Sequence, residues 1–273
     1  MYIFLLKQYV IRIGRVVLPA LLFLTPLKVA AEQFNLFVQP VQSQEVTEKA
    51  FAPLARYLAS QTGQEYRVMT TLNFVTYWQR MRRGNEFDLV LDAAHFTDYR
   101  IKKMGYEVLA KLPDTVSYSL VTDESTLLFD ADELIGKRVA TAPSPSLGGV
   151  RLTQLYPNIL RQPVSVPTNN FSDALNKLRK KAITGALVPT PLVNNDSTVN
   201  TVLTTEPVPH MALSASKKLN SDLKDKIRKA LLNAYKTPEG QVMLKEINFP
   251  RFEATSAREY DGYADMLEEV WGY

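Results

Sequence analysis

Short apolar segments alternate with amphipathic ones along this chain, and that order constrains the fold more than any other feature of the sequence. The apolar segments at 33–40, 66–70 and 87–91 have the length and composition of strands. Between them, residues 45–60 and 73–83 carry apolar side chains at helical spacing. The order strand, helix, strand, helix, strand predicts a parallel sheet covered by helices on both faces, which is a doubly wound α/β lobe.

A second series of the same kind follows. Strands are predicted at 137–142, 164–166 and 186–188, and helices at about 148–160 and 171–181. The sequence therefore predicts a second lobe of the same class.

The segment between the two series and the C-terminal part connect the lobes. A short helix is predicted at 95–104 and strands at 108–112 and 116–121. In the tail, Ser221 is predicted to cap one helix and Thr237 the next. The tail helices need a sheet to pack on, and the first lobe is their natural host.

The chain would then cross between the lobes twice, near 118–123 and near 206–212. The predicted division is residues 32–122 with 206–273 for lobe 1, and residues 123–205 for lobe 2.

The N-terminal segment, residues 1–31, is predicted to be a signal peptide. Basic residues come first, an apolar run follows at 16–27, and Ala30 and Ala31 offer small side chains before a cleavage after Ala31. An uncleaved anchor is the alternative. The run has only about 12 residues and contains Pro19 and Pro26, whereas a membrane span needs about 20. Cleavage is therefore favoured, and the mature protein is expected in the periplasm.

Charge and composition exclude several classes of protein. Of the 32 Lys and Arg residues, four lie in residues 1–31, which leaves 28 against 28 Asp and Glu in the mature chain. The densest basic run, 177–181, is short and is expected to be a solvated helix end, so no nucleic-acid partner is predicted. The absence of cysteine excludes disulfides and thiolate metal sites. Two histidines without cysteine predict no zinc site, and no cofactor is implied.

One turn combines features that favour an anion. Between 138 and 150 the chain passes from a strand through Ser144, Ser146, Gly148 and Gly149 into a helix. The hydroxyls can donate hydrogen bonds, glycines allow a ligand close to the backbone, and a helix begins with free N–H groups and positive potential. An ordinary capped helix after a turn is the alternative, and on chemistry alone the two interpretations are equally supported.

Several segments together are similar to one known family. They are Phe51 to Leu58 followed by Thr62 and Gly63, the helix and strand of 77–89, the segment 116–121, Leu134 to Ala140, and Thr237 to Gly240. In their order and spacing the chain resembles the phosphate-, phosphite- and phosphonate-binding proteins of ABC transporters. The resemblance implies the type II periplasmic binding protein fold, in which two doubly wound lobes are joined by a two-stranded hinge.

The same resemblance implies a function and a site. The protein would be a monomer that binds a small anionic ligand and delivers it to the membrane subunits of an ABC transporter, without catalysis. The anion would lie on the turn described above. Residues of the first lobe would close over it, and the matching positions are Gln39, Thr71, Asn73, Phe74, His95 and Tyr118.

For several single residues, a functional and a purely structural interpretation both remain open. His95 follows a strand end and either faces the cleft or simply begins a helix. Tyr118 either lines the hinge or packs in the core, and Asn170 either donates to the ligand or caps the helix from Phe171. Asp88 and Asp92, on one side of a strand, are either a catalytic pair or ordinary strand-end carboxylates.

The sequence also departs from the family pattern at Leu147, at 169–171 and at 182–186. These departures leave a second function open, a periplasmic sensor module that signals to a membrane protein. An enzyme is a third, although no Ser-His-Asp order and no nucleophile elbow is present.

Overall fold

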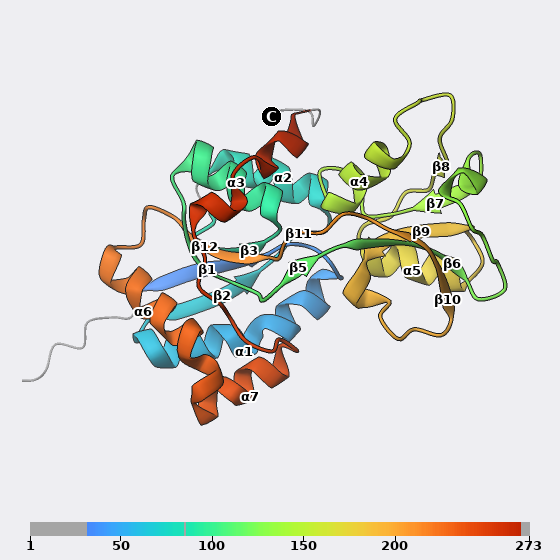
Figure 1. Ribbon diagram of the computed structural model, residues 1–273. Coiled ribbons are helices and arrows are strands. Elements are labelled where there is room, and N and C mark those ends of the chain that lie inside the picture. Colours follow the sequence, from blue (N-terminus) through green and yellow to red (C-terminus); the bar gives the residue numbers. More distant parts are fainter. Residues whose placement is uncertain (1–31, 85, 269–273) are drawn as a thin grey trace, which may run out of the picture. The chain divides into compact units, whose positions relative to one another are not determined.

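The computed structural model describes residues 32–84 and 86–268. The predicted signal peptide lies outside these residues. Within them the chain builds two five-stranded sheets and a two-stranded one (Figure 1). We call the first sheet with its helices lobe 1, and the second sheet with its helices lobe 2.

The first sheet has the strand order β2-β1-β3-β12-β4. Its strands are β1 Gln33–Val38, β2 Glu65–Met69, β3 Leu89–Asp92, β4 Glu107–Lys111 and β12 Ala212–Ala215. Strand β1 pairs in parallel with β2 and β3, as the alternation of strands and helices predicted. Strand β12 was not predicted. It is only four residues long, fully buried, and pairs antiparallel with both β3 and β4.

Helices cover both faces of this sheet. They are α1 Gln44–Thr62, α2 Phe74–Arg83, α3 Ala94–Tyr99, α6 Ser221–Asn233 and α7 Pro238–Glu246. Because side chains alternate along a strand, Leu36 packs in the core under α1, α6 and α7, whereas Phe37 packs in the core with α2. The tail helices therefore lie on lobe 1, as expected, and Figure 1 shows them beside α1.

Lobe 2 has the strand order β10-β6-β9-β7-β8. Its strands are β6 Tyr118–Asp123, β7 Arg138–Ala140, β8 Val164–Ser165, β9 Gly185–Pro189 and β10 Val199–Thr204, and its helices are α4 Leu147–Leu155 and α5 Phe171–Arg179. Strand β7 is parallel to β8 and β9, while β6 and β10 are antiparallel additions.

The hinge is the two-stranded sheet of β5, Thr115–Val116, and β11, Val208–Pro209. Both crossings between the lobes occur there, which confirms the type II architecture. One cluster of buried apolar side chains extends through both lobes, and the described chain packs as one compact unit. The residue boundaries of the two lobes therefore stay a prediction.

Short helical turns complete the chain. They are the π-helical turn η1 Arg100–Met104 and the 3₁₀ turns η2 Ala131–Leu134, η3 Thr190–Leu192, η4 Ala234–Lys236, η5 Ala257–Tyr260 and η6 Tyr263–Leu267.

Helix ends follow local chemistry, with two corrections. Gly63 ends α1 with a φ of 73°, in the left-handed region that glycine favours. Helix α4 ends at Leu155 rather than near residue 160, because the residue before Pro157 is driven out of the helical region. The cap of α6 is Asn220, whose Oδ1 accepts from Leu223 N at 2.8 Å, and not Ser221.

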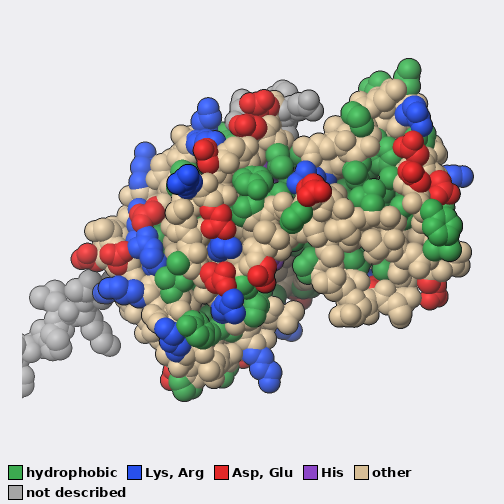
Figure 2. Space-filling model, viewed as in Figure 1, with side chains coloured by type: hydrophobic (Ala, Val, Ile, Leu, Met, Phe, Trp, Pro, Cys, Tyr) green, Lys and Arg blue, Asp and Glu red, His purple; other side chains and the backbone are tan. Residues whose placement is uncertain are grey.

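In the described part of the chain, no helix combines the length and the apolar character that a membrane span requires. On the face drawn in Figure 2, positive and negative side chains are interspersed over lobe 1 rather than gathered by sign.

Candidate functional site

The turn between β7 and α4 is held by Ser146. Its Oγ donates to Ala142 O at 2.6 Å and accepts from Gly149 N at 2.9 Å, so Ser146 is the N-cap of α4. A serine hydroxyl has one hydrogen, and here that hydrogen is already donated by a side chain that is fully buried. Ser146 therefore caps the helix in this structure, and its donation to an anion stays a prediction.

The two glycines of the turn are needed by the chain itself. A Cβ on Gly148 would overlap Thr141 and the Phe171 ring, and a Cβ on Gly149 would overlap the backbone of Ser144. Protein atoms therefore occupy the Cβ side of both glycines, and the approach of a ligand to their backbone stays a prediction. Ser144 is the hydroxyl of this turn that is exposed.

Three predicted residues of lobe 1 make hydrogen bonds within that lobe. Gln39 Oε1 accepts from Ala93 N at 3.2 Å, Thr71 Oγ1 donates to Asn73 O at 2.9 Å, and Asn73 Oδ1 accepts from Thr76 N at 2.9 Å. Asn73 thereby caps α2. These contacts position the loops that face lobe 2.

His95 connects the two lobes directly. Its Nε2 lies 2.9 Å from Pro145 O, and because a carbonyl only accepts, Nε2 carries a hydrogen. The other nitrogen, Nδ1, is buried without a hydrogen-bond partner. Burial lowers the pKa of His95 to about 4, and the positive charges of Arg100 and Arg151 act in the same direction. His95 lies in the first turn of α3 and also contacts lobe 2, and its role toward a ligand stays a prediction.

Phe74 and Tyr118 meet through a residue that the sequence analysis did not select, Phe171. The ring centroids of Phe74 and Phe171 are 5.7 Å apart, and those of Tyr118 and Phe171 are 5.6 Å apart. All three side chains are buried. The sequence pattern could have indicated Phe171 as a buried residue, since it is the first apolar residue after the helix cap Asn170.

Asn170 is that cap, with Oδ1 accepting from Asp173 N at 2.9 Å. This hydrogen bond is the contact that the capping alternative predicted.

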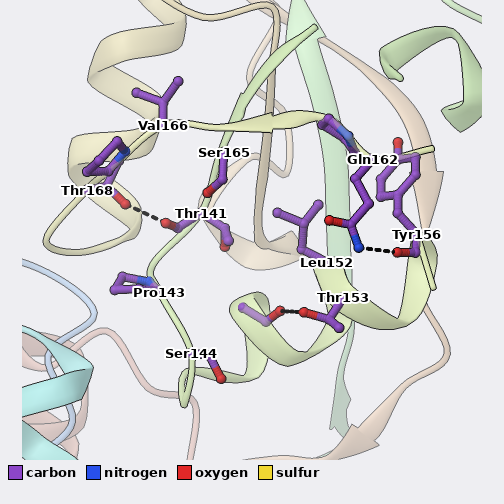
Figure 3. A pocket seen from close by; sticks show the side chains of 13 residues that line it. Thr141, Pro143, Ser144, Leu152, Thr153, Tyr156, Gln162, Ser165, Val166 and Thr168 are labelled. Carbon is purple, nitrogen blue, oxygen red and sulfur yellow. Dashed lines mark hydrogen bonds between the residues drawn. The ribbon is translucent and has the colours of Figure 1, made fainter. Parts of the chain in front are cut away.

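A cavity of about 340 Å³ opens beside the turn (Figure 3). Of the predicted site residues, Ser144 and Gly149 line it, while those of lobe 1 do not. Its other walls are the length of α4 and the edge strand β8 with the residues after it.

Arg151, one turn into α4, was also missed. Its Nη1 donates to Gln154 Oε1 at 2.9 Å and its Nη2 to Glu206 O at 3.1 Å, and its Nε is buried without a partner. Among the described residues no carboxylate pairs with it. Arg151 is therefore a cation without a counter-charge near the start of α4.

The two aspartates of the β3 segment do not face each other as a pair. Asp92 is fully buried in an ion pair with Arg100, and Asp88 accepts from Asn35 N and Lys218 Nζ. Within residues 32–84 and 86–268, no cluster of three or more His, Asp or Glu side chains could hold a metal ion.

Replacing Ser146 by alanine is expected to lower the free energy of unfolding by about 1 kcal/mol or more, because α4 loses its cap. Ser144→Ala, two residues away on the exposed part of the turn, is the matched control and should change stability by less than about 0.5 kcal/mol. Urea unfolding measures both. Equal effects would contradict the assignment of the cap.

Stability should also depend on pH through His95. In the unfolded chain a histidine has a pKa near 6.5, and in the folded protein that of His95 is about 4. Between these values the unfolded state binds the proton, so stability is present above pH 6.5 and is lost as pH falls toward 4. The slope contributed is at most about 1.4 kcal/mol per pH unit.

Urea unfolding between pH 4.5 and 7.5 tests this dependence, with His95→Gln as the variant that cannot titrate. The variant should have a smaller slope than the parent protein. Identical slopes would mean that His95 titrates alike in both states.

Comparison with known proteins places this geometry in a family. Residues 36–260 match the model of the family described as "ABC transporter, phosphonate, periplasmic substrate-binding protein". No curated protein matches the chain.

Solved structures share the fold at low sequence identity. PhnD1 from Prochlorococcus marinus in complex with methylphosphonate superposes with a TM-score of 0.76 and 14% identity, over 86% of this chain and 97% of that one. A binding protein component of an ABC phosphonate transporter from Pseudomonas aeruginosa gives 0.72 and 12%, over 84% and 83%. A protein from Xanthomonas citri bound to ATP gives 0.68 and 13%, over 87% and 97%.

The family match covers most of the chain and agrees with the two lobes and the hinge. The chain belongs to the family of periplasmic substrate-binding proteins of phosphonate ABC transporters.

Proposed function

We propose that this protein binds a small phosphonate- or phosphate-like oxyanion at the start of α4 and delivers it to the membrane subunits of an ABC transporter. The observation that carries the proposal is the unpaired positive potential there. Helix α4 begins at an exposed serine turn, and Arg151 in its second turn has no carboxylate partner among the described residues.

The donors at this site are neutral or permanently charged. The N–H groups of Leu147 and Gly148 have no partner in the described structure, whereas that of Gly149 is bonded to Ser146. Ser144 adds an exposed hydroxyl. None of these groups changes protonation near neutral pH, so recognition needs no proton transfer. The site suits binding and release better than chemistry on the ligand.

Isothermal titration of residues 32–273 with methylphosphonate, phosphate, phosphite, sulfate and acetate tests the proposal. At least one phosphorus oxyanion should bind, and Arg151→Gln should weaken it at least tenfold, because a hydrogen bond to a charged group contributes about 1.5–3 kcal/mol. Ser144→Ala should also weaken it. Binding of none of these anions would refute the oxyanion function.

Two matched variants act as controls. Arg161→Gln removes an exposed arginine of the same lobe that pairs with Asp132, and Ser256→Ala removes an exposed serine of lobe 1. Neither should change the affinity. If they weaken binding as much as Arg151→Gln and Ser144→Ala do, the anion lies elsewhere.

The cleavage site of the signal peptide and the monomeric state belong to the same proposal. Cleavage after Ala31 fits the fold, because the chain enters it at once: Glu32 N donates to Gln64 Oε1 at 2.7 Å and β1 begins at Gln33. We expect a monomer whose intact mass begins at Glu32, measured by mass spectrometry and sedimentation. Should the bound form engage a membrane signalling protein and no transporter, the sensor alternative would replace the transport output.

A further inference from the structure

Three polar groups at the contact between the lobes have no hydrogen-bond partner in the described part of the chain. His95 Nδ1 comes from the first turn of α3 and Arg151 Nε from the second turn of α4, and both atoms are buried. The hydroxyl of Tyr118, at the start of β6, also makes no hydrogen bond among the described residues, and its side chain is buried. Buried polar groups without a partner are rare in proteins, so three of them together indicate a binding site.

The three groups lie near one another and near the turn between β7 and α4. Burial is the main cause of the lowered pKa of His95, and the positive charge of Arg151 adds to it. Burial raises the pKa of Tyr118, and the same positive charge opposes that rise. Arg151 is therefore close enough to both side chains for its charge to act on them. His95 also contacts the turn itself, because its Nε2 lies 2.9 Å from Pro145 O.

The contact with Pro145 decides which ring nitrogen of His95 can accept a hydrogen bond. A carbonyl oxygen only accepts, so the single hydrogen of the neutral ring is on Nε2, and Nδ1 carries a lone pair. Burial lowers the pKa of His95 to about 4, and the charged groups that act on the ring, Arg100 and Arg151, are both positive. The ring is therefore neutral above about pH 5, where Nδ1 is an acceptor without a donor.

Together the three groups combine two donors with one acceptor. Arg151 Nε and the Tyr118 hydroxyl can donate, and Arg151 also brings a positive charge, whereas His95 Nδ1 can only accept. An oxyanion that keeps one hydrogen pairs with all three, because its ionised oxygens accept and its hydroxyl donates. A fully ionised anion of the same shape and charge would place an oxygen lone pair against Nδ1 and leave that acceptor unpaired.

We propose that His95 determines the specificity of the site: its Nδ1 accepts a hydrogen bond from the bound oxyanion and thereby selects anions that keep one hydrogen over fully ionised anions of the same shape and charge. This inference rests on the proposed function and adds the rule by which the site discriminates among tetrahedral anions. Tyr118 and Arg151 donate to ionised oxygens, which both kinds of anion have, so they contribute affinity without this discrimination.

Isothermal titration of residues 32–273 at pH 5.5 with methylphosphonate and methanesulfonate tests the inference. At this pH each anion carries one negative charge, and the two differ by the hydrogen that methylphosphonate keeps. Methylphosphonate should bind at least about tenfold more tightly, because methanesulfonate leaves Nδ1 of His95 unpaired in a buried site. Equal affinities would overturn the inference and leave the proposed function intact. If neither anion binds, the inference is overturned as well, and the titration with phosphate and phosphite decides the proposed function separately.

Two variants separate the acceptor from a donor. His95→Phe keeps an aromatic ring but removes both ring nitrogens, so the ratio of the two affinities should fall toward one. Tyr118→Phe removes only the hydroxyl and keeps the ring that packs against Phe171, so both anions should bind more weakly with the ratio of the parent protein. If His95→Phe weakens both anions equally and keeps the parent ratio, His95 only holds the lobes together and the inference is overturned.

His210→Phe is the matched control, because His210 is the other histidine of the chain and lies at the hinge, directly after β11. It should keep both affinities and their ratio. A ratio that falls equally in the two histidine variants would contradict the assignment to His95. The ratio in the parent protein requires no variant, so the inference remains testable if His95→Phe does not fold.

Discussion

Replacing Asp92 by alanine is expected to lower the free energy of unfolding by about 3–5 kcal/mol. Arg100 Nη1 lies 2.5 Å from Asp92 Oδ2, and both side chains are fully buried. Tyr77 donates to the same carboxylate at 2.7 Å and accepts from Arg100 Nη2 at 2.8 Å. Without the carboxylate, the guanidinium remains among aromatic rings with no counter-charge. Urea unfolding at pH 7 measures the loss.

Two further variants test whether the buried pair of Asp92 and Arg100 contributes more to stability than an exposed ion pair does. Arg56→Ala removes the ion pair with Glu246, whose side chains are 68% and 49% exposed, and should cost less than about 0.5 kcal/mol. The double replacement Asp92→Leu with Arg100→Met should recover much of the loss, because no uncompensated charge stays buried. A single Asp92→Ala variant as stable as Arg56→Ala would contradict the argument.

This cluster also shows why the site loop is placed as it is. Asp92 ends β3, and the next residue, Ala93, donates its N–H to Gln39 Oε1. His95 follows at the start of α3 and reaches Pro145 of lobe 2. The ion pair therefore anchors the loop that makes the contact between the lobes, although none of its members was a predicted ligand residue.

The alternation of strands and helices was sufficient to predict most of the fold, because buried parallel strands and their covering helices have distinct periodicities. The elements that the alternation did not predict depend on contacts between residues distant in the sequence. Strand β12 is too short to have a periodicity of its own and exists because β3 and β4 both pair with it. The early end of α4 was readable from Pro157, but the apolar Ile159 and Leu160 continued the helical pattern and concealed it.

The site was harder to predict for a similar reason. Sequence chemistry predicted the cap at Thr237 and offered the one at Asn170, because a cap is a local contact. It could not show that Ser146 donates its hydroxyl hydrogen to Ala142 O, or that Gly148 faces the Phe171 ring. Those facts depend on residues distant in the sequence, as does the cavity beside the turn, whose walls include α4 and the edge strand β8.

Replacing Phe171 by alanine is expected to cost about 3–5 kcal/mol of stability and to loosen the contact between the lobes. The ring is fully buried, packs edge-on against Phe74 and Tyr118, and fills the space that Gly148 leaves. Deletion leaves a cavity between the first residues of α2, α5 and β6, and the surrounding chain can fill it only in part. Urea unfolding reports the cost, and small-angle scattering reports the radius of gyration.

Phe252→Ala is the matched control, because Phe252 is equally buried but packs against Phe249 in the core under α1, α6 and α7. It should lose a similar amount of stability without any change in the radius of gyration. Phe171→Ala should lose stability and also increase the radius, since the aromatic contact that joins the lobes is gone. If both variants keep the parent radius, the lobes are held by the hinge and by the bond from His95 to Pro145, and Phe171 contributes only packing.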